Sequence, residues 1–256
     1  MQVINSKQNS KLKHVYKLAS NKNYRSQCNE AVVYGEHLIE EALRYNKLLN
    51  IFVVESAYNK YQHLLKPVNE VYLLPQELIS KINVLDSEVE IVGTISMNFS
   101  EVDQELYDGD VVILDNIQDP GNLGTIFRTM CACKVRHVVL HHCVDPYNVK
   151  VLRASQAIQL GLNLYILDDL DQLINNYNGE ILATSLQTET TLYQKDLSIS
   201  PIMWVFGNEG MGVNQKILTK VRNFVKIPHE STVESLNVAQ ALTVCLFEMY
   251  RQRISR

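Results

Sequence analysis

Short apolar runs alternate with helix-like segments along most of the chain, and this alternation limits the fold more than any other feature. The runs "IFVV", "VVIL" and "IMWVF" each hold four or five consecutive apolar residues. Runs of that length are typical of strands buried on both faces of a sheet. Segments between them, such as "EHLIEEALRYN", place apolar side chains on one side of a helix. The sequence therefore predicts an α/β protein with largely parallel sheets.

The alternation breaks once, between Asn98 and Asp110. The segment "NFSEVDQELYDGD" is acidic and contains no sustained apolar run, as is typical of a linker. We therefore expect an N-terminal domain at residues 1–97, a linker at 98–109 and a C-terminal domain at 110–256. A chain of 256 residues is long enough for two such domains.

Overall composition is that of an ordinary soluble globular protein, with 46% hydrophobic and 20% charged residues. The net charge of −4 does not indicate a nucleic-acid partner, but the distribution of charge is uneven. Residues 1–29 contain no acidic residue. This basic start is either an RNA-binding surface or a solvated helix face, and charge alone leaves both readings open. Its six basic residues are Lys7, Lys11, Lys13, Lys17, Lys22 and Arg25.

No stretch of the sequence approaches the roughly 20 apolar residues that cross a bilayer, and the N-terminus lacks the apolar segment of a signal peptide. The five cysteines are an odd number and show no disulfide-framework spacing. We expect a reduced, cytoplasmic protein with no membrane partner.

Three loops rich in polar residues follow predicted strands in the second domain. They are "DNIQDPGNLGTIFRT" (115–129), "GNEGMG" (207–212) and "HESTVESLN" (229–237). In open parallel sheets, ligands bind beyond the carboxyl ends of the strands. Three such loops at equivalent ends of one sheet predict a single site.

The spacing of these loops excludes the common phosphate-binding motifs. "GNEGMG" reverses the dinucleotide fingerprint, and the chain contains no P-loop. Glu209 would repel a phosphate held by the neighbouring main chain. A nucleophile elbow, G-x-S-x-G, is absent as well. The loop therefore favours a ligand with hydroxyls, an amino group or a cationic centre.

A cysteine- and histidine-rich run, "CACKVRHVVLHHC", raises the question of zinc. Its spacing matches no pair of standard zinc-binding knuckles, and free cysteine at a helix end often packs as a small apolar residue. The cysteines also lack neighbouring loop glycines to form an oxyanion hole, which argues against a thiol nucleophile. We expect no metal. The residues concerned are Cys131, Cys133, His137, His141, His142 and Cys143.

Together, "DNIQDPGNLGTIFRT", "VFGNEGMGV" and "IPHESTVESLNVAQAL" resemble the three motifs of the SpoU (TrmH) family of RNA ribose methyltransferases, in the SPOUT superfamily. The start, "INSKQNSKLKHVYKLASNKNYR" followed by "VVYGEHLIEEAL", resembles the opening of its ribosomal-RNA branch, whose substrate-binding domain is similar to ribosomal protein L30e. The resemblance covers nearly the whole chain, more loosely from Asn46 to Asp108.

This resemblance implies a C-terminal parallel-sheet SPOUT domain with a deep trefoil knot and a smaller L30e-like α/β domain before it. It implies that S-adenosylmethionine binds in the knot, that a homodimer forms through the final helix and the first-motif helix, and that a ribose 2′-hydroxyl of large-subunit (23S) ribosomal RNA is methylated. The alternatives are a transfer-RNA ribose 2′-O-methyltransferase and a non-catalytic RNA-binding protein of the same fold.

The same resemblance implies individual roles. Arg128 matches the catalytic arginine, and it more readily positions the hydroxyl and a phosphate than removes a proton, because an arginine guanidinium stays protonated and is a very poor base. Asn122 precedes the apolar helical run and could also cap that helix. Ser235 and Asn237 match a substrate-side pair, with capping of the last helix as the alternative for Ser235. The catalytic set is Arg128, Asn122, Glu209, Ser235 and Asn237.

Contacts to the methyl donor are expected to be mostly main-chain, at Thr184, Ser185, Leu186, Gly207, Ile227 and Leu236. RNA contacts are expected at Lys7, Lys11, Lys13 and Arg25. One position departs from the family pattern, because Ser231 stands where the third motif usually has glycine. Serine disfavours positive φ, so we expect a different turn there, with donor binding retained.

Overall fold

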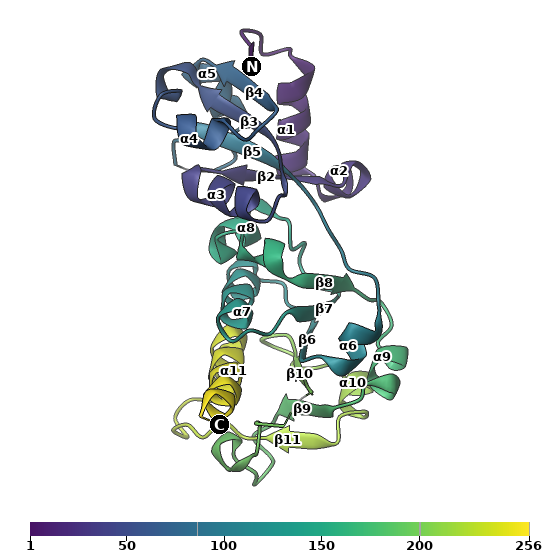
Figure 1. Cartoon of the computed structure of the whole chain (residues 1–256). Coiled ribbons are helices and arrows are strands. Elements are labelled where there is room, and N and C mark those ends of the chain that lie inside the picture. The colour runs from purple at the N-terminus through teal and green to yellow at the C-terminus, as the bar shows by residue number, and fades with distance from the viewer. Residues whose placement is uncertain (86, 200, 256) are drawn as a thin grey trace. The chain divides into compact units, whose positions relative to one another are not determined.

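The computed structural model describes residues 1–85, 87–199 and 201–255. The chain forms two compact units (Figure 1). Unit 1 contains Met1–Asn98 together with Asp145–Leu160, and unit 2 contains Phe99–Val144 and Gly161–Arg256. Residues 145–160, which the sequence places in the second domain, thus cluster with the first. No helix in the described part of the chain has the length and apolar character needed to cross a membrane.

Unit 1 is built on a five-stranded mixed sheet in the order β1-β4-β3-β5-β2. The first three strands in that order run parallel, whereas β5 pairs antiparallel with both β3 and β2. The expectation of a largely parallel sheet is therefore wrong for two of the four strand pairs in this sheet. Apolar periodicity predicts a strand but not its direction. The strands are β1 (Gln2–Val3), β2 (Glu30–Tyr34), β3 (Leu48–Val54), β4 (Glu70–Leu74) and β5 (Ile91–Ser96).

The helices of unit 1 include one that the sequence did not predict. Helix α1 begins at Ser10 because the Asn9 side chain caps it by accepting from the Lys11 amide at 2.8 Å. Helix α2 was missed because "KNYRSQC" has almost no apolar period and buries only Arg25. The helices are α1 (Ser10–Ser20), α2 (Lys22–Cys28), α3 (Glu36–Arg44), α4 (Gln62–Leu65), α5 (Gln76–Ile82) and α8 (Val149–Ser155), with short 3₁₀ turns η1 (Glu55–Ala57) and η2 (Ile158–Gly161).

Helix α8 ends at Ser155, although the segment "VKVLRASQAIQL" reads as one helix as far as Leu160. Gln156 and Ala157 follow it with positive φ values of 59° and 58°, so the helix cannot continue. The Ser155 hydroxyl closes the turn by accepting from the Ala157 amide at 3.1 Å. Helix α8 packs against β2 of unit 1.

Unit 2 contains the predicted all-parallel sheet, with six strands in the order β11-β9-β10-β6-β7-β8. Every residue of β6 and of β10 is buried, as their unbroken apolar runs predicted. The strands are β6 (Val111–Asp115), β7 (His137–His141), β8 (Asn163–Ile166), β9 (Glu180–Thr184), β10 (Ile202–Phe206) and β11 (Asn223–Val225).

Helices cover this sheet on both faces (Figure 1). Helices α7 (Pro120–Ala132) and α11 (Val238–Ile254) pack against each other on one face, where the Thr129 and Thr243 hydroxyls lie 2.9 Å apart. Helices α6 (Gln104–Asp108), α9 (Asp171–Asn176) and α10 (Gln215–Leu218) close the core cluster on the other face. A 3₁₀ turn, η3, spans Leu192–Gln194.

The predicted linker is partly ordered, since α6 lies within it. The Asp103 side chain caps α6, and Leu106 is fully buried in the core of unit 2. One buried leucine in an acidic segment gives no periodic pattern, which is why the sequence did not reveal this helix.

Candidate active site

The three motif loops begin at one edge of the sheet of unit 2. Strands β6 and β10 are neighbours, and β9 lies between β10 and β11. Because all these strands are parallel, the segments that follow them start at the same carboxyl edge. The sheet order therefore brings the three predicted loops, and the end of β9, into one region.

Asn122, Glu209 and Asn237 form a continuous chain of side-chain hydrogen bonds across these loops. Asn122 Nδ2 donates to Glu209 Oε1 at 2.5 Å, and Asn237 Nδ2 donates to Asn122 Oδ1 at 3.0 Å. Asn237 Oδ1 in turn accepts from the Ala239 and Gln240 amides at the start of α11. One residue from each motif thus takes part, and the two amide side chains are held in a defined orientation.

The caps of α7 and α11 differ from those the sequence suggested. Asp119 caps α7 by accepting from the Asn122 amide at 2.7 Å, and Pro120 occupies the first helical position. Asn122 lies inside the helix, so its side chain is free to join the polar chain. At α11 the cap is Asn237 rather than Ser235. The capping roles considered for Asn122 and Ser235 are therefore wrong.

The loop "GNEGMG" folds tightly on itself. Asn208 and Gly212 exchange two main-chain hydrogen bonds, at 3.0 and 2.9 Å. The Asn208 side chain donates to the Asn116 carbonyl at 2.9 Å. A Cβ on Gly207 would lie 2.2 Å from the carbonyl carbon of Gly212. The need for glycine at position 207 thus comes from packing within the loop.

A buried histidine–aspartate contact fixes this loop to the sheet. His141 Nδ1 lies 2.8 Å from Asp115 Oδ1, and Asp115 Oδ2 accepts from the Asn214 amide at 2.7 Å. Both ionisable side chains are buried. The ends of β6 and β7 and the chain after "GNEGMG" are therefore held together below the site.

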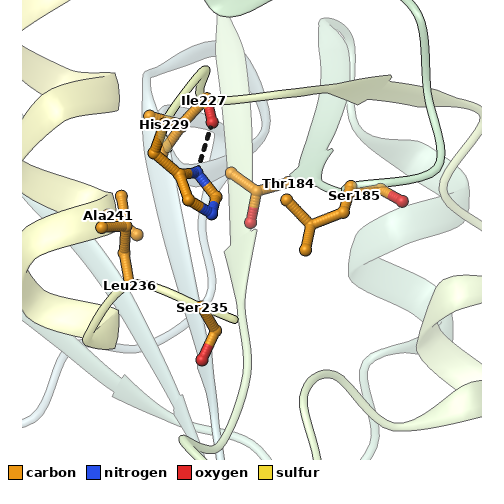
Figure 2. Close-up of a pocket in the computed structure, with 8 residues that line it drawn as sticks. Thr184, Ser185, Ile227, His229, Ser235, Leu236 and Ala241 are labelled. Carbon is orange, nitrogen blue, oxygen red and sulfur yellow. Dashed lines mark hydrogen bonds between the residues drawn. The ribbon is translucent and has the colours of Figure 1, made fainter. Parts of the chain in front are cut away.

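A cavity of about 150 Å³ lies at the ends of β9 and β11 (Figure 2). Five of the six predicted donor-binding residues line it, together with the predicted catalytic Ser235. Gly207 is not among its lining residues. Sequence reasoning missed His229 and Ala241 as lining residues, although both belong to the third motif. The lining residues are Thr184, Ser185, Leu186, Ile227, His229, Ser235, Leu236 and Ala241.

The lining of this cavity is chemically mixed. Ile227, Leu236 and Ala241 supply apolar surface, and three hydroxyls come from Thr184, Ser185 and Ser235. His229 Nδ1 donates to the Ile227 carbonyl at 2.8 Å, which fixes the imidazole ring within the cavity, as Figure 2 shows. None of the described residues that line it carries a carboxylate. An apolar wall with hydroxyl and main-chain groups at its edge fits a flat heterocycle carrying a sugar.

The backbone at Ser231 takes no left-handed conformation. Positive φ occurs elsewhere among the described residues, but not at this serine. The chain turns instead through a hydrogen bond from the Val233 amide to the Glu230 carbonyl at 3.1 Å. The replacement of the usual glycine is thus accommodated by a different turn without the strain of positive φ.

Arg128 stands apart from the polar chain. Its side chain is exposed on α7 and has no hydrogen bond or ion pair with any residue the structure describes. It lies six positions after Asn122, or roughly 9 Å further along the helix. The arginine does not pair with Glu209 in this chain, so it is available to an external anion.

In unit 1, the predicted RNA-binding residues have different environments. Lys7 and Lys13 are exposed, whereas Lys11 is paired with Glu70 at 3.2 Å. Arg25 is only 3% exposed, and its Nη2 lies 2.6 Å from Asp145 Oδ2 while Nη1 donates to the Leu18 carbonyl. The prediction that Arg25 contacts RNA is wrong, because its guanidinium is buried inside the protein and paired with Asp145.

The cysteine- and histidine-rich run has structural partners instead of a shared ligand. Burial raises the pKa of the Cys133 and Cys143 thiols to about 11, so both stay protonated at neutral pH. His137 bonds Tyr165, and His141 bonds Asp115. In the described chain, the group whose ligand atoms lie close enough for a metal is Glu36, Glu40 and His63 of unit 1, all of them surface side chains.

Comparison with known proteins identifies the family. Residues 110–247 match the family described as SpoU rRNA Methylase. The chain belongs to this family, which confirms the predicted family and its class of enzyme, an RNA methyltransferase.

Two curated relatives align along almost the whole chain. An uncharacterized tRNA/rRNA methyltransferase of Synechocystis is 32% identical over 98% of this chain and 94% of its own length. The 23S rRNA (guanosine(2553)-2′-O)-methyltransferase RlmP of Bacillus subtilis is 28% identical over 97% of this chain and 99% of its own length.

Solved structures show the same fold. The SpoU methyltransferase AviRb of Streptomyces viridochromogenes superposes with a TM-score of 0.85 at 23% identity, covering 96% of this chain and 98% of its own. An AdoMet-bound rRNA methyltransferase of Sinorhizobium meliloti gives a TM-score of 0.84 at 23% identity, covering 97% of each chain. At this level of identity the likeness concerns the fold alone.

Proposed function

We propose that this protein transfers a methyl group from S-adenosylmethionine to a ribose 2′-hydroxyl of 23S ribosomal RNA. One observation carries the proposal. The segment Ser235–Asn237 lines the cavity through Ser235 and Leu236, and it joins the Asn122–Glu209 pair through Asn237. A single stretch of three residues therefore links a nucleoside-sized cavity to an ordered set of polar side chains.

S-adenosylmethionine supplies a methyl group on a positively charged sulfur, ready for attack by an oxygen. The residues present fit such a group, because the cavity combines apolar surface with hydroxyls and strand-end main chain. Thr184, Ser185, Leu186, Ile227 and Leu236 would hold it. Gly207 supports the site from the neighbouring loop, where its missing side chain lets Gly212 pack against it.

The acceptor side is formed by Glu209 and Arg128. Asn122 occupies Glu209 Oε1, and a carboxylate has a second oxygen that can accept a hydrogen bond from the ribose hydroxyl. Arg128 has an exposed guanidinium, which binds phosphate through a fork of N–H donors. In this proposal Glu209 orients the hydroxyl and Arg128 holds an adjacent phosphate of the RNA.

The trefoil knot is also proposed. It is supported by the path of the chain around β11, since the Ser185 amide donates to the Val225 carbonyl at 3.0 Å, and Lys226 bonds Thr190 and Leu192 through its main chain. The segment after β11 thus runs between the end of β9 and residues 190–192, as a threaded chain would.

A homodimer through α7 and α11 is proposed on the strength of an exposed apolar side chain, Phe247, on α11, which is 47% exposed. An L30e-like, RNA-binding role for unit 1 is proposed from its basic first helix. Action on ribosomal RNA would place the protein in the cytoplasm.

The deciding experiment maps ribose methylation across the RNA of cells with and without the gene, followed by methylation of purified 23S rRNA by the purified protein. We expect one 23S ribose to lose its methyl group in the mutant and to regain it in vitro. Loss of a methyl group from transfer RNA would support the alternative substrate, for which the name of the Synechocystis relative leaves room. RNA binding without any methyl transfer would support a non-catalytic protein.

A further inference from the structure

Unit 1 has a groove between α1 and α5, and two of the predicted RNA-binding lysines, Lys7 and Lys13, line it. Its volume is about 240 Å³, and its deepest residues, Leu12 and Ile82, are 4% and 1% exposed. The groove is smaller than a typical site for a drug-sized ligand, but it can admit one flat ring system. Its lining residues are Lys7, Leu12, Lys13, Tyr16, Lys17, Lys81 and Ile82.

Among the described residues that line this groove, every charged side chain is basic. Four of the seven are lysines, and none of the seven is a carboxylate. None of the four forms an ion pair with a residue the structure describes, and Lys17 has only a weak contact with the Tyr24 ring, at 5.4 Å from its centroid. By contrast, Lys11 on the same helix is neutralised by Glu70. The groove therefore concentrates uncompensated positive charge above an apolar floor.

An exposed aromatic side chain stands in this ring of lysines. Tyr16 is 52% exposed, and no residue in the described chain bonds its hydroxyl. Helical spacing places Lys13, Tyr16 and Lys17 close together on α1, with Tyr16 next to the buried Leu12 four positions before it. An aromatic ring flanked by lysines matches the chemistry of an unpaired nucleotide, whose base stacks while its phosphates meet the cations.

We propose that this groove binds one unpaired nucleotide of single-stranded RNA. The base stacks against Tyr16 over the apolar floor, and the flanking phosphates contact Lys13, Lys17 and Lys81. A base-paired nucleotide would not fit, because its ring is already stacked inside the duplex. The inference deepens the proposed function, on which it rests, by naming the part of the RNA that unit 1 holds.

The test uses the full chain and fluorescence anisotropy with a labelled oligoadenylate, compared with a blunt RNA duplex of the same length. We expect the oligoadenylate to bind more tightly than the duplex. Loss of one stacked base weakens binding by about tenfold or more, so Tyr16→Ala should do so, while Tyr16→Phe should bind as the wild type does. Circular dichroism should show both variants folded, since Tyr16 is exposed.

Charge is tested with a matched pair of lysine variants in unit 1. Lys13→Ala should reduce the slope of log affinity against log salt by about 0.7, the value for one phosphate contact with a single strand. Lys66→Ala removes the same charge at an exposed position outside the groove and should leave the slope unchanged.

Two results would overturn the proposal. One is oligoadenylate binding that is absent, or that is equally tight in Tyr16→Ala and wild type. The other is a duplex bound as tightly as the single strand. Failure of the proposed function can be distinguished from failure of the groove proposal. The protein could lack methyl transfer activity and still bind oligoadenylate through Tyr16, and the groove proposal would then hold.

Discussion

Asn122 and Glu209, 87 positions apart in sequence, are joined by a hydrogen bond of 2.5 Å from an amide to a carboxylate. A glutamate is unexpected in a glycine-rich loop, and this contact gives Glu209 a structural partner there. Asn122 holds one carboxylate oxygen, and Asn237 holds Asn122 from the other side. Glu209 is thus a positioned acceptor in the candidate site.

Replacing Asn122 with alanine should therefore damage catalysis more than donor binding. The change removes both side-chain bonds of Asn122 and frees Glu209 to move, whereas Asn237 keeps its bonds to the start of α11. A displacement of about 1 Å at a reacting centre can lower a rate on the order of a hundredfold. We expect kcat for RNA methylation to fall by that order, with S-adenosylmethionine affinity by calorimetry unchanged. Thr125→Ala, exposed on the same helix, is the control, and full activity in Asn122→Ala would contradict the role.

Replacing Arg128 with alanine should abolish methyl transfer while donor binding survives. The side chain is exposed and has no intramolecular partner in the described chain, so its loss costs little stability. Arg128→Lys keeps the charge but loses the planar fork, and we expect it to restore only part of the activity. Single-turnover methylation and donor calorimetry are the two measurements. Turnover in Arg128→Ala equal to wild type would remove the arginine from the mechanism.

The two glycines of "GNEGMG" should respond very differently to substitution. A Cβ at Gly207 would meet main-chain atoms of Gly212 and Val213 at 2.2 Å, whereas at Gly210 the nearest atom is 3.6 Å away. Gly207→Ala must displace backbone, so we expect a loss of at least about 3 kcal/mol, the upper end for overpacking. Gly210→Ala is the matched control and should unfold near the wild-type temperature. Equal melting temperatures of Gly207→Ala and Gly210→Ala would show that the loop can open without a loss of stability.

Arg25 should matter for stability and not for RNA contact. Its guanidinium and Asp145 form an ion pair in which both side chains are under 10% exposed. Removing one partner of a buried pair costs about 3–5 kcal/mol, because the other charge is left uncompensated. We expect that loss for Arg25→Met in urea unfolding, with Lys22→Met as an exposed control. Arg25→Met combined with Asp145→Leu should recover part of the stability, and a double variant worse than the single one would contradict this account.

The sequence predicted strands better than it predicted their partners. Buried runs such as "VVIL" and "IMWVF" can only be strands here, and the structure has them at Val111–Asp115 and Ile202–Phe206. The residues of β5 do not reveal its antiparallel direction, because the pattern of apolar side chains along a strand reads the same in both directions. Helix α6 could not be predicted from apolar spacing, because it buries a single leucine.

The same limit applies to individual side chains. Five cavity residues could be placed because the resemblance to the family assigns them to motif positions and strand ends, which are local features of the sequence. The burial of Arg25 could not, because it depends on Asp145, which lies 120 positions away. Likewise, Asp119 rather than Asn122 became the cap of α7 because Pro120 fixes where the helix starts.

Glu248 of α11 should give unit 2 a pH-dependent part of its stability. Its carboxylate accepts from Arg251 Nε and Nη2 and from Gln252 Nε2, each at 2.8 Å. The hydrogen bond from Arg251, followed by that from Gln252, outweighs desolvation and lowers the pKa of Glu248. A carboxyl whose pKa is lower in the folded state stabilises the fold above its unfolded pKa of about 4.3, and this stabilisation is lost as pH falls through the folded value.

We therefore expect Glu248→Gln to reduce the free energy of unfolding at neutral pH by about 1 kcal/mol, the typical worth of one hydrogen bond. The difference from wild type should shrink as pH falls below about 4, because protonation makes the native carboxyl as neutral as the amide. Urea unfolding from neutral pH down to the lowest pH at which the chain stays folded measures both curves. Glu234→Gln, at an exposed position, is the control for a change of net charge. A gap between Glu248→Gln and wild type that stays constant with pH would show that the carboxylate charge contributes nothing to the stability of α11.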